Sequence, residues 1–92
     1  MKILEEHIFR LRDDILCAFF EEGGVIFHLE DRLSHVINRT GASIVALLDG
    51  ERDVGGLIQM IAREYGRQEE AIREDVTDFL KNLLKRGWVY VR

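Results

Sequence analysis

The arrangement of apolar residues changes once along the chain, near residue 39. Before this point, apolar residues alternate with polar ones or form short blocks, which is typical of β-strands. After it, they recur at spacings of three and four, which is typical of helices with one buried face. The pattern predicts an α+β protein in which a three-stranded antiparallel sheet is followed by three helices, in the order β-β-β-α-α-α.

The first part predicts a three-stranded meander over residues 15–38. Its strands are Ile15–Glu21, Val25–Glu30 and Leu33–Asn38. Gly23-Gly24 predicts the first two-residue turn, because both central positions of a type I′ turn need positive φ. Asp31-Arg32 predicts the second turn. The second strand is then central, and the first and third strands are edges.

Two-residue turns have a consequence for the two faces of this sheet. They would pair Phe20 with Phe27, Ala18 with Leu29, and Phe27 with Val36 on one face. That face also carries Leu16 and Val25, and we expect it to form the core. The opposite face is too apolar to meet only water, and it carries Ile15, Cys17, Phe19, Ile26, His28, His35 and Ile37. We expect either the N-terminal segment, residues 1–14, or another chain to cover it.

The second part predicts three helices within residues 40–87. Thr40 is expected to cap the first helix, and Asp49-Gly50 to end it. Asp53 is expected to cap the second helix, and Gly66 to end it. The third helix should run from about Glu69 to Arg86, with acids in its first turns and bases in its last, as the helix dipole favours. Gly87 ends this helix, and residues 88–92 form an extended tail that can pack on the sheet.

Length and charge narrow the functional class. Ninety-two residues make a single domain, 1–92, and the net charge is −4. Nucleic-acid phosphates are bound through an excess of Lys and Arg, so we expect no nucleic acid. An alternative with a similar fold is a winged helix-turn-helix DNA-binding regulator. In that protein the third helix would be the recognition helix, but the acids in its first half would repel DNA phosphates. A structural dimerisation module is the other alternative.

The sequence gives little sign of chemistry or of a membrane. With one cysteine and no apolar run of about 18 residues, we expect a cytoplasmic protein with no membrane association. Cys17 lies in mid-strand without a predicted base. His28 and His35 would face each other, with Glu30 or Cys17 nearby, but two histidines are too few for a closed zinc site. We expect no catalytic residue, no metal and no cofactor.

Several short motifs, taken in order, resemble the PqqD family over the range from Ile15 to Trp88. They are Gly23-Gly24-Val25-Ile26, Val36-Ile37-Asn38-Arg39-Thr40-Gly41, Ile44 with Leu47-Leu48-Asp49-Gly50, Val54 with Leu57-Ile58, Tyr65, Asp75-Val76, Phe79-Leu80, Leu83 and Gly87-Trp88-Val89. The resemblance implies a winged-helix-like fold that binds the leader region of a ribosomally made precursor peptide. It also implies presentation of that peptide to a modifying enzyme, commonly a radical S-adenosylmethionine (SAM) enzyme.

The resemblance places the peptide along the third strand and the third helix. An edge strand has unpaired backbone groups that can accept a guest strand, and neighbouring side chains give specificity. The expected peptide-binding residues are Leu33, Ser34, His35, Val36 and Ile37 on the strand, and Arg73, Val76, Thr77, Leu80, Lys81 and Leu84 on the helix. The helical wheel leaves open whether the Leu80/Leu84 margin or the margin with Asp75, Asn82 and Arg86 faces the strand. An open edge also permits a homodimer by strand exchange.

Overall fold

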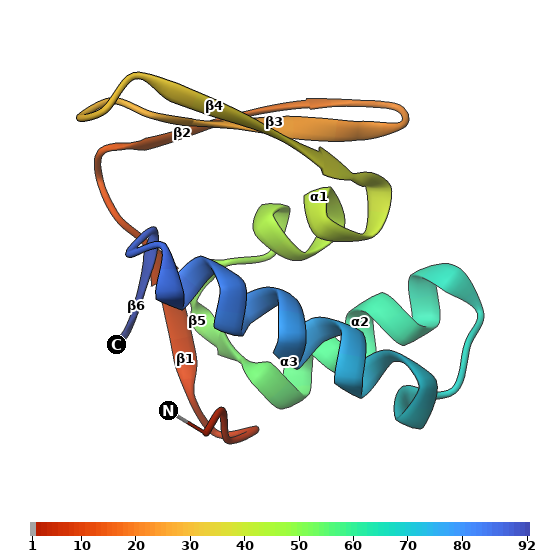
Figure 1. Ribbon diagram of the computed structural model, residues 1–92. Helices are drawn as coiled ribbons and strands as arrows, with labels where there is room; N and C mark the ends of the chain where they lie inside the picture. The colour runs from red at the N-terminus through yellow and green to blue at the C-terminus, as the bar shows by residue number, and fades with distance from the viewer. Residues whose placement is uncertain (1) are drawn as a thin grey trace.

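The computed structural model describes residues 2–92 and confirms the α+β class, with an antiparallel three-stranded sheet leading into helices. The elements in chain order are β1 (Ile8–Leu11), β2 (Ile15–Phe20), β3 (Gly23–His28), β4 (Leu33–Asn38), α1 (Arg39–Ala46), β5 (Asp49–Asp53), α2 (Val54–Tyr65), α3 (Glu69–Lys85) and β6 (Val89–Val91), as Figure 1 shows. Within the described residues, no helix has both the length and the apolar character needed to cross a membrane.

A second sheet, which the sequence did not predict, joins the two ends of the chain. Its strand order is β5-β1-β6, and both of its pairings are antiparallel. In the pairing of β1 with β6, Phe9 lies opposite Val91 and Leu11 opposite Val89. The N-terminal segment and the C-terminal tail therefore pair with each other, and neither adds a strand to the first sheet.

The β2-β3-β4 meander is confirmed, but its turns lie elsewhere than predicted. Phe20 pairs with Gly23, so Glu21-Glu22 form the first turn and Gly23-Gly24 belong to β3. A Cβ atom on Gly23 would lie 2.3 Å from the carbonyl oxygen of Ile37, so this glycine allows β4 to approach closely. The glycine pair, which suggested a turn, serves strand packing.

The cross-strand pairs change accordingly. Ala18 lies opposite Val25, and Val25 lies opposite Val36, so the predicted pairs Phe20–Phe27, Ala18–Leu29 and Phe27–Val36 are wrong. His28 pairs with Leu33, which makes the second turn four residues long, 29–32. The predicted His28–His35 pair is also wrong, because His35 lies opposite Ile26.

The predicted core face of this sheet is reversed. Ile15 and Ile26 are buried, at 7% and 0% exposure, whereas Leu16, Phe20 and Val36 are 53%, 54% and 81% exposed. The helices lie on one side of the sheet, and no element covers its other side in Figure 1. The prediction favoured the face with more phenylalanine, but the helices cover the face with more isoleucine. The N-terminal segment covers neither face as a layer, because it forms β1.

The helix ends follow side-chain capping rules. Asn38, and not Thr40 as predicted, caps α1, because its Oδ1 accepts a hydrogen bond from the Gly41 amide at 2.8 Å. Asp53 caps α2 through the Gly56 amide at 2.8 Å, and Gly66 ends α2 with φ of 61°, both as predicted. The core between the helices and the first sheet includes Ile26, Ile44, Leu57, Ile58, Ile61, Val76 and Leu80, all at 1% exposure or less.

Candidate functional site

The outer edge of β4 is open. Within residues 2–92, β4 pairs only with β3, and the chain termini form the other sheet. The Phe20–Gly23 pair closes a two-residue turn and is therefore a hydrogen-bonded pair. Because such pairs alternate along antiparallel strands, the backbone groups of Ser34 and Val36 point away from β3. A guest strand would find unpaired donors and acceptors at these two residues.

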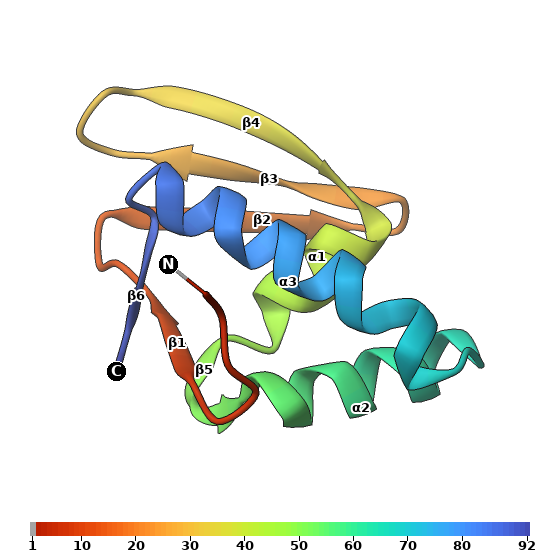
Figure 2. The same cartoon turned by 60° about the horizontal axis from the view of Figure 1, so that its bottom comes forward.

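One margin of α3 borders the end of this edge. Asp75, Asp78, Phe79 and Asn82 line a hollow of about 360 Å³ together with Asn38, Thr40, Gly41 and Ile44 at the junction of β4 and α1. A Cβ atom on Gly41 would lie 2.9 Å from Cε1 of Phe79, so the glycine lets α1 approach α3 closely. The margin of α3 that carries Asp75 and Asn82 is thus the one that faces the junction of β4 and α1. Helix α3 runs in the opposite direction to β4, as Figure 2 shows.

The helix residues predicted for peptide binding lie elsewhere. Val76 and Leu80 are fully buried in the core and present no surface to a guest. Arg73 lies near the N-terminal segment, where its Nε donates a hydrogen bond to Oε2 of Glu5 at 3.3 Å. Helical spacing puts Thr77, Lys81 and Leu84 on this same margin, away from β4. The helix residues predicted for peptide binding therefore do not lie beside β4 in this structure.

The strand residues predicted for peptide binding all lie on β4, with alternating directions. His35 and Ile37 point inward and are half-buried, whereas Ser34 and Val36 point outward and are exposed. The ring centroids of His35 and Trp88 are 4.7 Å apart. The guanidinium carbon of Arg86 lies 5.1 Å from the Trp88 ring centroid. The Trp88 ring therefore packs on the first half of β4. Arg86 covers this ring and also lines a hollow with Asp13, Asp14, His28 and Glu30.

Sequence reasoning missed Asp78 and Phe79 as residues next to β4. Both lie outside the Leu80/Leu84 margin of the helix, which supplied the helix residues predicted to bind the peptide. The one local signal was Gly41, since a glycine inside a short helix indicates that another element approaches closely. The sequence does not say which element that is, because the partner of Gly41 lies 38 residues along the chain at Phe79.

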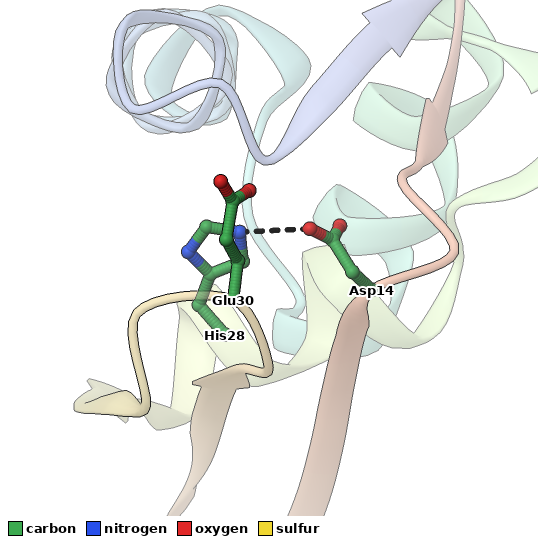
Figure 3. Close-up of side chains that lie close together, drawn as sticks. All are labelled: Asp14, His28 and Glu30. Atoms are coloured by element: carbon green, nitrogen blue, oxygen red, sulfur yellow. Dashed lines mark hydrogen bonds and ion pairs between the residues drawn. The ribbon is translucent and has the colours of Figure 1, made fainter.

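A cluster of His28 with carboxylates lies at the start of the β3–β4 turn (Figure 3). Nε2 of His28 is 2.9 Å from Oδ2 of Asp14, and Nδ1 is 3.0 Å from Oδ2 of Asp31. The contact with Asp31, followed by the hydrogen bond with Asp14, raises the pKa of His28, and the same pairing lowers the pKa of Asp31. The ring shares a hydrogen bond with Asp14 through Nε2, whereas the contact of Nδ1 with Asp31 is a short ion pair without hydrogen-bond geometry when the ring is protonated.

Two features of this region bear on metal binding and nucleophilic chemistry. One ligand atom each from Asp14, His28 and Glu30 lie within 4.8 Å of one another, so these residues are the ones that could hold a divalent ion. Of these three residues, Asp14 and His28 share a hydrogen bond at 2.9 Å. Burial raises the pKa of the Cys17 thiol, which opposes formation of the thiolate that a nucleophile needs.

A larger hollow lies at the opposite edge of the sheet. It measures about 550 Å³, is mainly apolar, and is lined by Phe19, Phe20, Ala42, Met60 and neighbouring residues. Strand β2, like β4, pairs only with β3 within the described chain. The sheet therefore offers two open edges, and the end of β4 adjoins α3 at the hollow lined by Asn38 and Phe79.

Comparison with protein families and curated proteins gives consistent matches. The family described as "Coenzyme PQQ synthesis protein D (PqqD)" matches residues 23–89. A "PqqA binding protein" of Klebsiella pneumoniae (strain 342) is 31% identical over 72 residues, which cover 78% of this chain and 75% of that protein. A protein of the same name from Gluconobacter oxydans (strain 621H) is 37% identical over 52 residues, covering 56% of this chain and 54% of that one.

Solved structures share the fold. "Lasso peptide synthetase B1 complexed with the leader peptide" is 27% identical, with a TM-score of 0.75 over 90% of this chain and 98% of that chain. The structure of "TbiB1 in Complex with the TbiA(beta) Leader Peptide" has a TM-score of 0.77 at 21% identity, over 87% and 93% of the two chains. The PqqD truncation of Methylobacterium extorquens PqqCD has a TM-score of 0.80 at 18% identity, over 96% and 94%.

Proposed function

This chain belongs to the PqqD family, and we propose that it binds the leader region of a ribosomally made precursor peptide and presents it to a modifying enzyme. The names of its relatives support this, because they are described as PqqA binding proteins. So does the synthetase B1 structure at 27% identity, which was solved with a leader peptide. The observation that carries the proposal is the open edge of β4 beside α3.

We propose that the leader adds to β4 as a fourth strand of the β2-β3-β4 sheet. Its main chain would bond to the outward backbone groups of Ser34 and Val36. Alternate side chains would point inward, toward α3, because successive residues of a strand face opposite sides. The hollow at Asp78 and Phe79 would receive one of these inward side chains.

The partner enzyme, and not this chain, would then catalyse the modification of the peptide. We propose a separate radical SAM enzyme, with this chain acting as an adaptor that holds the leader. Strand addition fixes the register of the peptide through many main-chain bonds, and fixed placement lowers the entropic cost of the enzyme's reaction. The part of the precursor that follows the leader would extend beyond the edge of β4, where that enzyme could reach it.

An NMR titration tests where the peptide binds. The probe is a synthetic leader of the precursor peptide encoded beside the gene, added to the ¹⁵N-labelled chain. We expect the largest shift changes in residues 33–38 and 75–82. Changes confined to β2 and the hollow at Phe19 and Phe20 would place the guest at the other edge. If no amide responds to any neighbouring precursor, the chain does not bind leaders.

A further inference from the structure

A hollow of about 620 Å³ lies between the loop before β2, the end of β3 and the residues that follow α3. Three acids and two arginines line it beside His28, namely Asp13, Asp14, Glu30, Arg12 and Arg86. Among residues 2–92, neither arginine forms an ion pair within 4.0 Å. Their guanidinium carbons lie over aromatic rings, 5.6 Å from the Tyr90 centroid and 5.1 Å from the Trp88 centroid. The carboxylates of this hollow are therefore not neutralised by its arginines.

Three side chains of the hollow lie together in Figure 3. One ligand atom each from Asp14, His28 and Glu30 lie within 4.8 Å of one another. The donors of a tetrahedral zinc ion lie about 2.1 Å from the metal and therefore about 3.4 Å from one another. Nε2 of His28 and Oδ2 of Asp14 are 2.9 Å apart, close to that spacing. Side-chain shifts of about 1 Å would bring Glu30 into the same shell, and water would complete it, as in open zinc sites.

The other nitrogen of the His28 imidazole also fits a metal ligand. Nδ1 is buried and has no hydrogen-bond partner within the described chain, although Oδ2 of Asp31 lies 3.0 Å away. A metal on Nε2 leaves the proton of the ring on Nδ1, and histidines that bind metals donate this N–H to a carboxylate. Asp31 is in place to accept it. The His28 side chain is only 14% exposed, so protein groups hold the ring in this position.

We propose that Asp14, His28 and Glu30 bind one Zn²⁺ ion, with water as the fourth ligand and Asp31 as the carboxylate behind the imidazole. The donor set favours this ion, because imidazole suits zinc whereas Mg²⁺ and Ca²⁺ take oxygen ligands. The site differs from the pairing of His28 with His35 that the sequence suggested, since Asp14 takes the place of His35. The inference is independent of leader binding.

Isothermal titration calorimetry of the chelator-treated chain with Zn²⁺ tests the site. The titration is made at pH 8, because the proton and the metal compete for Nε2. We expect one ion per chain with a micromolar Kd that millimolar Mg²⁺ does not change. Asp14→Asn, His28→Gln and Glu30→Gln should each raise the Kd by about tenfold or more. Asp31→Asn should raise it by about tenfold, as expected for a carboxylate that orients a ligand.

Matched changes outside the ligand set serve as controls. Asp13→Asn makes the same charge change in the same loop as Asp14→Asn, and His7→Gln removes a histidine elsewhere. Each should change the Kd by less than about threefold, and Cys17→Ser should leave it unchanged. Co²⁺ gives a second readout, because it quenches nearby fluorescence. Trp88 is the only tryptophan, and its ring centroid lies 6.4 Å from that of His28.

Each outcome supports or overturns the inference. Neither heat of binding nor Trp88 quenching at millimolar Zn²⁺ or Co²⁺ would overturn it. Binding that survives in His28→Gln, or that is lost in Cys17→Ser or His7→Gln, would also overturn it, because the ion would then lie elsewhere. Circular dichroism checks that each variant folds. Glu30 is exposed, so Glu30→Gln tests the ligand set even if His28→Gln does not fold.

Discussion

At the residue scale, single side chains explain why β4 is usable as an edge. Gly23 lets β3 and β4 pair closely, and Asn38 ends β4 by capping α1. Between them, Val36 is the most exposed large apolar side chain in the described range, at 81%. Its side chain contributes little to the fold, and its backbone points outward. Val36 is therefore the position at which binding and folding can be separated.

We predict that Val36→Pro weakens leader binding by roughly tenfold or more and leaves the fold intact. Proline removes the outward amide and cannot pair with a guest, but it removes no bond to β3. One hydrogen bond contributes about 0.5–1.5 kcal/mol, and the ring adds a clash with the guest strand. Fluorescence anisotropy would give the affinity and a thermal melt the stability. Val36→Thr, which keeps the amide, is the control, and equal affinities for all three proteins would argue against strand addition.

His28 gives a pH-dependent prediction. Its pKa is raised above the usual 6.5 by Asp31 and Asp14, so the folded state holds the proton more tightly than the unfolded state. The resulting stabilisation is fully present below pH 6.5 and is lost as the pH rises through the raised pKa. The lowered pKa of Asp31 matters only in acid, because that contribution is lost as the pH falls below its usual 3.8.

Urea denaturation of the wild type and His28→Gln at pH 6 and pH 9 tests this prediction. The wild type should exceed the variant in urea midpoint at pH 6, and the difference should shrink at pH 9. His7→Gln, a histidine hydrogen-bonded only to a backbone amide in this structure, serves as the control for a general histidine effect. A difference between wild type and His28→Gln that is the same at both pH values would exclude the ion pairs as a source of stability.

At the element scale, the sequence predicted most of what depends on local pattern. The three helices, the Asp53 and Gly66 caps and the meander are confirmed, because each has a signal within a few residues. Strands β1 and β5 were missed, and β6 was predicted only as an extended tail, since these strands have only three to five residues each. Strand β5, with the sequence DGERD, has no apolar residue, so only its partner β1 makes it a strand.

The local pattern of apolar residues did not predict which face of the sheet, or which margin of α3, points toward the neighbouring elements. Both register errors in the first sheet shifted the pairing by an even number of residues, so each side chain stayed on its predicted face. Which face meets the helices depends on where α1 leaves β4, and which margin of α3 faces β4 depends on the contact between Gly41 and Phe79. Both orientations are set by contacts between residues far apart in the sequence, and the candidate site depends on both.

The corrected core face makes a direct prediction about stability. Ile26→Ala should lower the free energy of unfolding by about 2–5 kcal/mol, because it leaves a cavity in the core. Leu16→Ala, on the opposite face of the same sheet, should cost under about 1 kcal/mol because its side chain is 53% exposed. Chemical denaturation would measure both, with unchanged m-values as the check on two-state unfolding. Equal losses would mean that the outer face is also covered.

At the scale of the whole molecule, the two sheets have separate roles. The β5-β1-β6 sheet holds both ends of the chain together, whereas the β2-β3-β4 sheet presents the open edge. The outer face of the β2-β3-β4 sheet exposes an apolar surface formed by Leu16, Phe20 and Val36. A homodimer by strand exchange at the open edge stays a prediction, and analytical ultracentrifugation over a range of concentrations would test it.

This separation predicts that stability and binding respond differently to loss of the last strand. Deleting residues 89–92 removes the buried Val89 and the hydrogen bond from the Arg92 amide to the Ile8 carbonyl at 2.7 Å. We expect a loss of about 2–3 kcal/mol, or roughly 8–24 °C in Tm for a domain of this size. Leader affinity measured at 10 °C should change less than twofold, because Trp88, the edge of β4 and the hollow at Phe79 remain. Tyr90→Ala, an exposed change in the same strand, is the control for stability. A folded truncation that no longer binds would show that the terminal sheet shapes the binding site.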